Sequence, residues 1–320
     1  MKNNFPRFCI EETSFIFNDT DFKNIASFIK IFIEIIMKIK DDNHQITRWS
    51  KFEFINILPD ITVTELMYNP RKSPLEHDLR ILFMKLINQC QHWDDNYSIK
   101  TKNVFIGQQL INGESIGYVF EQVISNRGVS CLCLKRIDQL ADVIETNSGT
   151  ERALLHFIFS LNSIIIFYRN IIEIENFSEE EYINHGKLAF PNLFFCFGIH
   201  KQFRRFRQDY RSIRSVITYH LATINDNFHQ ICKEKSFEPE KVCKTFGSCW
   251  NIDMSLESPN TKNNRKAMKE REVIINNELV VCEWHTKLTP TYDRIHFHPG
   301  KMNIADGKII IGIFAEHLST

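Results

Sequence analysis

The sequence lacks a net charge, because 39 Lys and Arg residues balance 39 Asp and Glu residues among 320. This balance excludes a globally basic nucleic-acid binder, although it leaves room for a local basic site. The chain also lacks the short motifs of nucleotide enzymes: it has no GxxxxGK[ST] loop, no GxGxxG fingerprint and no GxSxG elbow. The sequence therefore does not predict nucleotide hydrolysis or dinucleotide chemistry.

Paired cysteines are missing as well. The nine cysteines are scattered, and the closest two, Cys131 and Cys133, do not form a CxxC motif. Zinc ribbons and fingers need paired ligands about two to four residues apart. We therefore expect free thiols, mostly buried, and neither a metal nor a cofactor.

Long apolar segments are also absent. The most apolar run, residues 157–168, is too short to cross a bilayer. Residues 1–14 lack the apolar core and cleavage site of a signal peptide. These features predict a cytoplasmic protein with no membrane partner. The hydrophobic and charged fractions, 43% and 24%, are those of an ordinary globular protein, and the length suggests two domains.

Helical periodicity dominates the first three quarters of the chain. Apolar residues recur at steps of 3 and 4 over residues 22–39, where Thr20 or Asp21 can cap the helix, and again over residues 78–93. Residues 151–174 predict a long helix, and Ser178 with Glu181 forms a capping box for the next one. We therefore expect a large, mostly α-helical body over residues 1–245, with a subdomain break near 95–150.

The last 75 residues or so favour strands instead. Short β-type runs cover residues 272–275, 279–288, 294–298 and 308–314, and Asn276-Asn277 separates the first two as in a hairpin. Connections this short favour antiparallel pairing. The sequence thus predicts an α+β protein in which residues 246–320 form a small antiparallel β-sheet domain.

One face of two of these strands concentrates polar groups. Alternate residues of a strand share a face, so Glu283, His285 and Lys287 lie together on one strand. The same rule groups the polar residues of the next strand. They are Arg294, His296 and His298. If the two strands pair, all six side chains line one surface, and His317 lies near its rim.

Three interpretations of this surface remain open. His, Lys and Arg suit metal-independent RNA cleavage, in which a base activates the ribose 2′-OH and cations stabilise the transition state. A metal nuclease would use Glu283 as a ligand beside Lys287, but another strand follows where such sites usually have a helix. The third interpretation is a half-exposed strand with a solvated polar face.

A second basic feature lies in residues 201–214. Four arginines, Arg204, Arg207, Arg211 and Arg214, step by 3, 4 and 3, which predicts one stripe along a helix. Such a stripe can contact the phosphate backbone of RNA or DNA, or dock an acidic partner. It can equally be a solvated helix face, or pair with the acidic stretch at residues 141–181.

The C-terminal residues resemble a poorly characterised bacterial family found beside phage-defence genes. The resemblance rests on residues 253–261, on Cys282-Glu-Trp-His285-Thr-Lys287, on Arg294-Ile-His296-Phe297 and on Ile311-Gly312 followed by His317-Leu318. The order of these strands also resembles a RelE-type toxin, a small antiparallel sheet that cleaves RNA without metal. The resemblance implies a ribonuclease-type effector. Its matched site residues are His285, Lys287, Arg294 and His296.

The leading hypothesis is an anti-phage effector that cleaves RNA and is controlled by its helical body or by a partner protein, an ATPase or a sensor. His285 and His296 would form the acid/base pair, with Lys287 and Arg294 opposite transition-state charge. The arginine stripe, His298 and His317 would contact RNA, or DNA. The alternative hypothesis is a non-enzymatic sensor or adaptor subunit whose polar face binds another protein.

Overall fold

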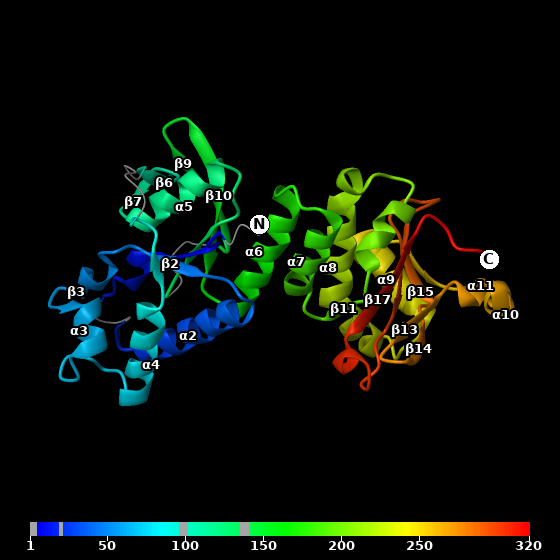
Figure 1. Cartoon of the computed structure of the whole chain (residues 1–320), viewed down its shortest axis with the longest axis horizontal. Coiled ribbons are helices and arrows are strands. Elements are labelled where there is room, and N and C mark those ends of the chain that lie inside the picture. Colours follow the sequence, from blue (N-terminus) through cyan, green and yellow to red (C-terminus); the bar gives the residue numbers. More distant parts are fainter. Residues whose placement is uncertain (1–4, 19–21, 96–101, 135–140) are drawn as a thin grey trace. The chain divides into compact units, whose positions relative to one another are not determined.

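The computed structural model describes residues 5–18, 22–95, 102–134 and 141–320 (Figure 1). It divides into two compact units, residues 1–167 and 168–320. The expected boundary after residue 245 falls inside the second unit. The expected break near 95–150 falls inside the first and partly outside the described residues, as do the proposed caps Thr20 and Asp21.

The prediction of a helical N-terminal body is wrong. The first unit is an α/β unit built on an eight-stranded mixed sheet with the order β5-β2-β1-β8-β10-β9-β6-β7. Five neighbouring strands are parallel: β5 (Gln91–His92), β2 (Ile46–Arg48), β1 (Phe8–Ile10), β8 (Ser130–Leu132) and β10 (Glu151–Ile158). Numbered along the chain, they follow the order 3-2-1-4-5 of doubly wound folds. Antiparallel β9 (Val143–Ser148), β6 (Val104–Ile106) and β7 (Gln109–Ile111) extend the sheet.

The strands escaped prediction because most of them are very short. Apart from β10, each parallel strand has only two or three residues, too few to show alternation. The long helix expected at 151–174 is in fact β10 followed by α6 (Leu161–Ile174). Ser163 Oγ accepts hydrogen bonds from the backbone N–H groups of Phe159 and Ser160, which fixes the turn between strand and helix. A buried strand and a buried helix can both be continuously apolar, so the hydrophobic pattern of residues 151–174 did not show where the strand ends and the helix begins.

Helices cover both faces of this sheet. The expected helices at 22–39 and 78–93 are confirmed as α2 (Ile25–Asp41) and α4 (His77–Asn88). Further helices of this unit are α3 (Val63–Tyr68) and α5 (Glu114–Ile124). Apolar residues of α5 pack with Cys9, Cys131 and Phe157. Figure 1 shows α2 and α4 on the opposite side of the sheet from α5.

The second unit is built on a five-stranded sheet with the order β11-β17-β16-β15-β12. The strands are β11 (Leu193–Phe195), β17 (Ile309–Ala315), β16 (Arg294–His298), β15 (Trp284–Lys287) and β12 (Met254–Leu256). Only β11 pairs in parallel, with β17. Because β11 precedes residue 246, the C-terminal segment does not form its sheet alone, which explains why no boundary lies at 245.

The remaining elements surround that sheet. The long helices are α7 (Glu179–Ala189), α8 (Tyr210–Glu234) and α9 (Pro239–Trp250); shorter elements are η3 (Ile199–Arg205), α10 (Pro259–Asn263), α11 (Arg265–Lys269) and the hairpin β13 (Glu272–Ile275) with β14 (Glu278–Val281). The capping box of Ser178 and Glu181 is confirmed at the start of α7. The expected hairpin is confirmed too, with Asn276 and Asn277 at φ 51° and 65° in its turn.

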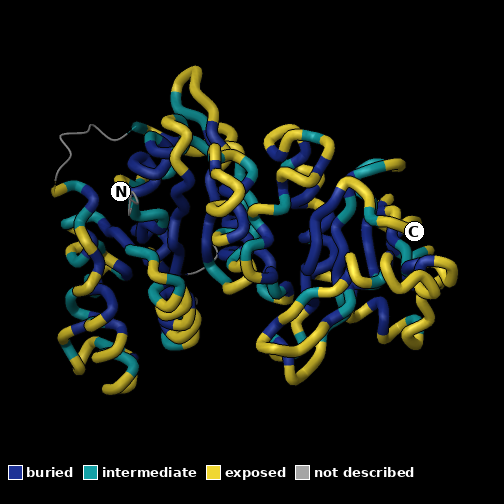
Figure 2. The backbone as a smooth tube through the Cα atoms, turned by 45° about the vertical axis from the view of Figure 1, so that its right-hand side comes forward, coloured by how far each residue is buried: buried dark blue, intermediate teal, exposed yellow. Residues whose placement is uncertain are grey.

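The two faces of the small sheet differ in character. Trp284 and Phe297 point to α8, where both rings contact Phe228. On the other side the β13–β14 hairpin approaches β17 so closely that a Cβ on Gly312 would lie 2.3 Å from Cys282 Sγ. Figure 2 shows the strands of this sheet as buried tubes and the connections around them as exposed. Within the described residues, no helix is long and apolar enough to cross a membrane.

Candidate active site

The polar face expected from the sequence forms on β15 and β16. These strands pair antiparallel, with His285 opposite His296 and Lys287 opposite Arg294. On the other side of β15, Ser255 of β12 lies opposite His285. The sheet thus places side chains from three strands in two adjacent rows, as the alternation of strand residues predicts.

The two rows differ in depth. His285 and His296 are buried, with 6% and 0% of their surface exposed, whereas Lys287 and Arg294 are half-buried. Lys287 Nζ lies 2.7 Å from Asp253 Oδ2, which neutralises part of its charge. Burial lowers the pKa of Arg294. The two histidines are thus the buried part of the site. Lys287 and Arg294 are the part that solvent can reach.

A buried ion pair beneath these residues was not predicted. Arg271, fully buried, places Nε 2.7 Å from Glu257 Oε1 and donates from Nη2 to Oε2 at 3.0 Å. Its Nη1 donates to the carbonyl of Ala267 at 2.7 Å. Burial raises the pKa of Glu257, but His285 and Arg271 lower it more, to about 2. Both residues lie outside the strands, where the alternation of side chains does not apply. Only the tertiary structure therefore identifies them as part of the site.

Glu257 also organises the histidine above it. Glu257 Oε1 lies 3.3 Å from His285 Nδ1, and Ser255 Oγ lies 3.0 Å from His285 Nε2. An ionised carboxylate only accepts hydrogen bonds, so it favours the tautomer with the proton on Nδ1. In that tautomer the lone pair of His285 Nε2 faces the hydroxyl group of Ser255. A base aligned by a carboxylate in this way is typical of sites that abstract protons from hydroxyls.

His296 is fully buried next to His285. The two rings are 5.0 Å apart, and His296 Nδ1 lies 3.6 Å from Glu257 Oε1. Burial, followed by the nearby His285, lowers the pKa of His296 to about 3. His296 is therefore neutral at physiological pH. Its ring packs against that of His285 in the buried part of the site.

Glu257, His285 and His296 also have the donor atoms of a metal site, since these atoms lie within 4.8 Å of one another. The environment disfavours a cation there. The carboxylate oxygen nearest both imidazoles already faces Arg271 Nε at 2.7 Å, and Arg294 adds a second positive charge nearby. Such a set suits an anion above it better than a divalent metal within it. The alternative ligand Glu283 instead pairs with Lys262.

The four arginines do not form one helical stripe, contrary to prediction. The helix η3 ends at Arg205 and α8 begins at Tyr210 with Asp209 as its cap, so the arginines are divided between two elements and a loop. Arg214 donates to the carbonyls of Glu173 and Glu175 and is engaged within the fold. The other three are exposed: they are Arg204, Arg207 and Arg211.

One of these arginines lies near the active face. The Arg207 guanidinium stacks 4.8 Å from the ring of Tyr292, and the Arg207 N–H donates to Asp293 Oδ1 at 2.7 Å. Asp293 directly precedes Arg294, so Arg207 is tied to the start of β16. His317, in contrast, lies on the exposed segment after β17. His298 lies at the far end of β16, in a pocket with Glu283.

The first unit holds two buried carboxylates after β1, at the edge where doubly wound sheets bind ligands. Burial raises the pKa of Glu11 to about 7 and raises that of Glu12. Both side chains accept backbone hydrogen bonds, Glu11 from Thr13 and Ser14, and Glu12 from Ser115 at the start of α5. Their evident role is to fasten this edge of the sheet.

Comparisons of the chain with protein-family models, with curated proteins and with solved structures found no match. The resemblance to a phage-defence family and to RelE-type toxins thus stays a prediction. The functional argument depends on the geometry of the site itself.

Acid should destabilise the second unit through its buried histidines. The pKa of His296 is lowered to about 3 and that of His220 to about 4, in both cases by burial first. Both are neutral in the folded protein but gain a proton below about pH 6.5 in the unfolded chain. Above about pH 6.5 neither histidine lowers the free energy of unfolding. Below that pH, each one lowers it by about 1.4 kcal/mol per pH unit until the pH reaches the pKa of the folded state.

Hydrogen exchange of the β15 and β16 amides at pH 7, 5.5 and 4.5, corrected for intrinsic rates, measures this loss. His220→Gln should show a shallower dependence, because one of the two titrating groups is gone. Equal protection at pH 7 and 4.5 in the unaltered protein would contradict the prediction.

Proposed function

We propose that the second unit cleaves RNA without a metal ion, with His285 as the group that transfers the proton. The observation that carries the proposal is the alignment of His285 between Glu257 at Nδ1, 3.3 Å, and a hydroxyl at Nε2, 3.0 Å. The half-buried cations Lys287 and Arg294 lie in the next row of the same face. A base beside two cations suits attack by a hydroxyl on a phosphodiester.

The reaction follows from these positions. His285 Nε2 takes the proton of a ribose 2′-OH, and the 2′ oxygen attacks the adjacent phosphorus. The bond from phosphorus to the 5′ oxygen breaks, and the imidazolium returns its proton to that oxygen. The products are a 2′,3′-cyclic phosphate and a 5′-hydroxyl end. Glu257 stabilises the imidazolium, Arg294 and Lys287 offset the charge on the phosphoryl oxygens, and Arg271 keeps Glu257 ionised and in place.

This proposal differs from the expected acid/base pair in one respect. His296 is fully buried and its pKa is about 3, so the proposal gives it a positioning role. In the proposal His285 serves first as base and then as acid, because the proton it takes is the one it returns. Lys287 and Arg294 keep the roles expected from the sequence, whereas Arg214 is engaged within the fold. Arg207 is the arginine best placed to guide an RNA backbone toward β16.

The deciding experiment uses the full chain, a single-stranded RNA and an all-deoxy oligonucleotide of the same sequence, each with and without EDTA. We expect cleavage of the RNA alone, unchanged by EDTA, with a 2′,3′-cyclic phosphate end. Cleavage that requires Mg²⁺ would favour a metal nuclease. No cleavage of either strand would favour the adaptor hypothesis.

A second candidate function rests on the same hydrogen bond. Ser255 Oγ donates to His285 Nε2, which is also the arrangement of a serine nucleophile beside its base. Ser255 Oγ would then attack phosphorus while the bond to the 5′ oxygen breaks, and that oxygen would take the proton from His285. Water would later hydrolyse the phosphoserine bond, so a 2′-OH would not be needed. Cleavage of the all-deoxy strand in EDTA would identify this mechanism, and the absence of such cleavage is the result we expect.

A further inference from the structure

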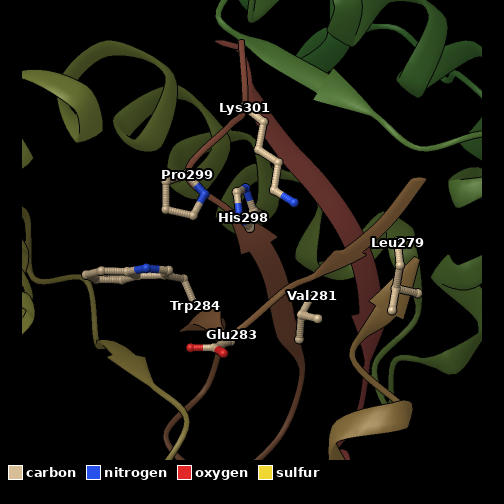
Figure 3. Close-up of a pocket in the computed structure, with 7 residues that line it drawn as sticks. All are labelled: Leu279, Val281, Glu283, Trp284, His298, Pro299 and Lys301. Atoms are coloured by element: carbon tan, nitrogen blue, oxygen red, sulfur yellow. The ribbon is translucent and has the colours of Figure 1, made fainter. Parts of the chain in front are cut away.

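A pocket opens at the far end of the active face, beyond His285 and His296. It has a volume of about 370 Å³ and lies between β15, β16 and the β14 strand of the hairpin (Figure 3). Its lining residues are Leu279, Val281, Glu283, Trp284, His298, Pro299 and Lys301. The reaction proposed above does not use any of them.

The pocket lies one step along the sheet from the reacting groups. Trp284 pairs with Phe297, so Glu283 and His298 form the next row after His285 and His296. Residues two apart on a strand are separated by about 6.6 Å. A nucleotide adjacent to a phosphate at His285 can therefore place its base in this pocket.

The polar groups of the pocket present both donors and an acceptor. His298 Nδ1 accepts a hydrogen bond from the Gly300 N–H at 2.9 Å, so Nε2 carries the proton and is a donor. Lys301 is exposed, and in the described part of the chain its ammonium has no ion-pair partner. Figure 3 shows Lys301 extending beside His298, with Glu283 on the neighbouring strand. Lys262 pairs with Oε2 of Glu283, which leaves Oε1 of that side chain as an acceptor.

The remaining walls are apolar. Leu279, Val281 and Pro299 supply aliphatic surfaces, and Trp284 also lines the pocket. The half-exposed Leu279 on the hairpin, with Val281 and Pro299, offers aliphatic surface against which a planar ring can pack. The combination of aliphatic side chains with hydrogen-bond donors and a carboxylate suits a splayed-out base.

We propose that this pocket binds a nucleobase of the RNA next to the cleaved phosphate, and that it prefers guanine. Guanine presents an acceptor, O6, next to the donors N1–H and N2–H₂. Lys301 or His298 can donate to O6, and Glu283 can accept from the two donors. Adenine lacks both the O6 acceptor and the N1–H donor, and cytosine lacks a ring N–H. This inference rests on the proposed function for the identity of the ligand as RNA.

The test measures binding of fluorescent 2′-O-methyl tetranucleotides that differ in one base, which the proposed reaction cannot cleave. The full chain should bind the guanine-containing strand at least about tenfold more tightly than its adenine counterpart. Glu283→Gln should reduce this ratio to near one. Lys301→Met should weaken binding of the guanine strand. His285→Ala should keep the preference, because it lies outside the pocket.

Equal affinity for all four strands would overturn the pocket proposal, whatever the cleavage assay shows. A guanine preference in a protein that cleaves nothing would refute the proposed reaction and keep the pocket as a nucleotide-binding site. Thermal unfolding of Glu283→Gln checks that the fold is kept. Retention of the full preference in a folded Glu283→Gln variant would also contradict the assignment.

Discussion

Arg271→Met is expected to lower the free energy of unfolding of the second unit by about 3–5 kcal/mol. The substitution leaves the carboxylate of Glu257 buried, with 7% exposure, and without the guanidinium that now lies 2.7 Å away. The pKa of Glu257, now about 2, should rise, because burial would no longer be offset by Arg271. His285 would then lose the charge that orients it.

Hydrogen exchange of the β15 and β16 amides measures this loss in the second unit alone, which matters because a chain of two units need not unfold in one step. The double variant Glu257→Leu with Arg271→Met should regain part of the stability, since no unpaired charge stays buried. Lys241→Met is the matched control: it breaks an exposed pair with Glu238 and should cost less than about 1 kcal/mol. If Arg271→Met and Lys241→Met lower the free energy of unfolding equally, the buried pair of Arg271 and Glu257 does not stabilise the second unit more than an exposed pair does.

His285→Ala is expected to reduce RNA cleavage by about 10²–10⁴-fold, the usual contribution of general acid–base catalysis. The remaining cations would still bind the substrate, so binding of the 2′-O-methyl strands should change far less than the rate. The measurement is single-turnover cleavage of the RNA substrate. His77→Ala on the exposed surface of α4 is the control and should leave the rate unchanged.

The same variant tests the anti-phage hypothesis that the sequence suggested. Cells that express the unaltered chain should plate phage less efficiently than cells that express His285→Ala. Lys287→Ala should reduce cleavage less than His285→Ala, because Asp253 already neutralises part of its charge. Full cleavage and full protection in both variants would refute the assignment of this face as the active site.

Local patterns predicted the C-terminal strands well. The turn at Asn276-Asn277, the alternation along 294–298 and the capping box at Ser178 depend on neighbours a few residues apart. The pairing of His285 with His296 and of Lys287 with Arg294 then follows from one short connection. Such features can be read from a sequence because the interacting groups lie close together along the chain.

The eight-stranded sheet was missed for the opposite reason. Strands such as β1 and β2 contain three residues each, and their identity depends on partners that are tens of residues away. The apolar run at 151–174 satisfied a helical pattern equally well until Ser163 and the pairing with β8 divided it. The arginine stripe failed similarly, because contacts with Asp293 and with the end of α6 bend the chain between Arg205 and Tyr210.

The balance of 39 cations against 39 anions, the absence of nucleotide-binding loops and the polar face of β15 and β16 were determined by the sequence alone. Only the tertiary structure brought Glu257 and Arg271 beneath His285, made His296 neutral by burying it and opened a pocket beside His298. Composition and strand alternation are properties of neighbouring residues. The tautomer, the charge and the burial of a side chain depend on long-range contacts, which exist only after the chain has folded.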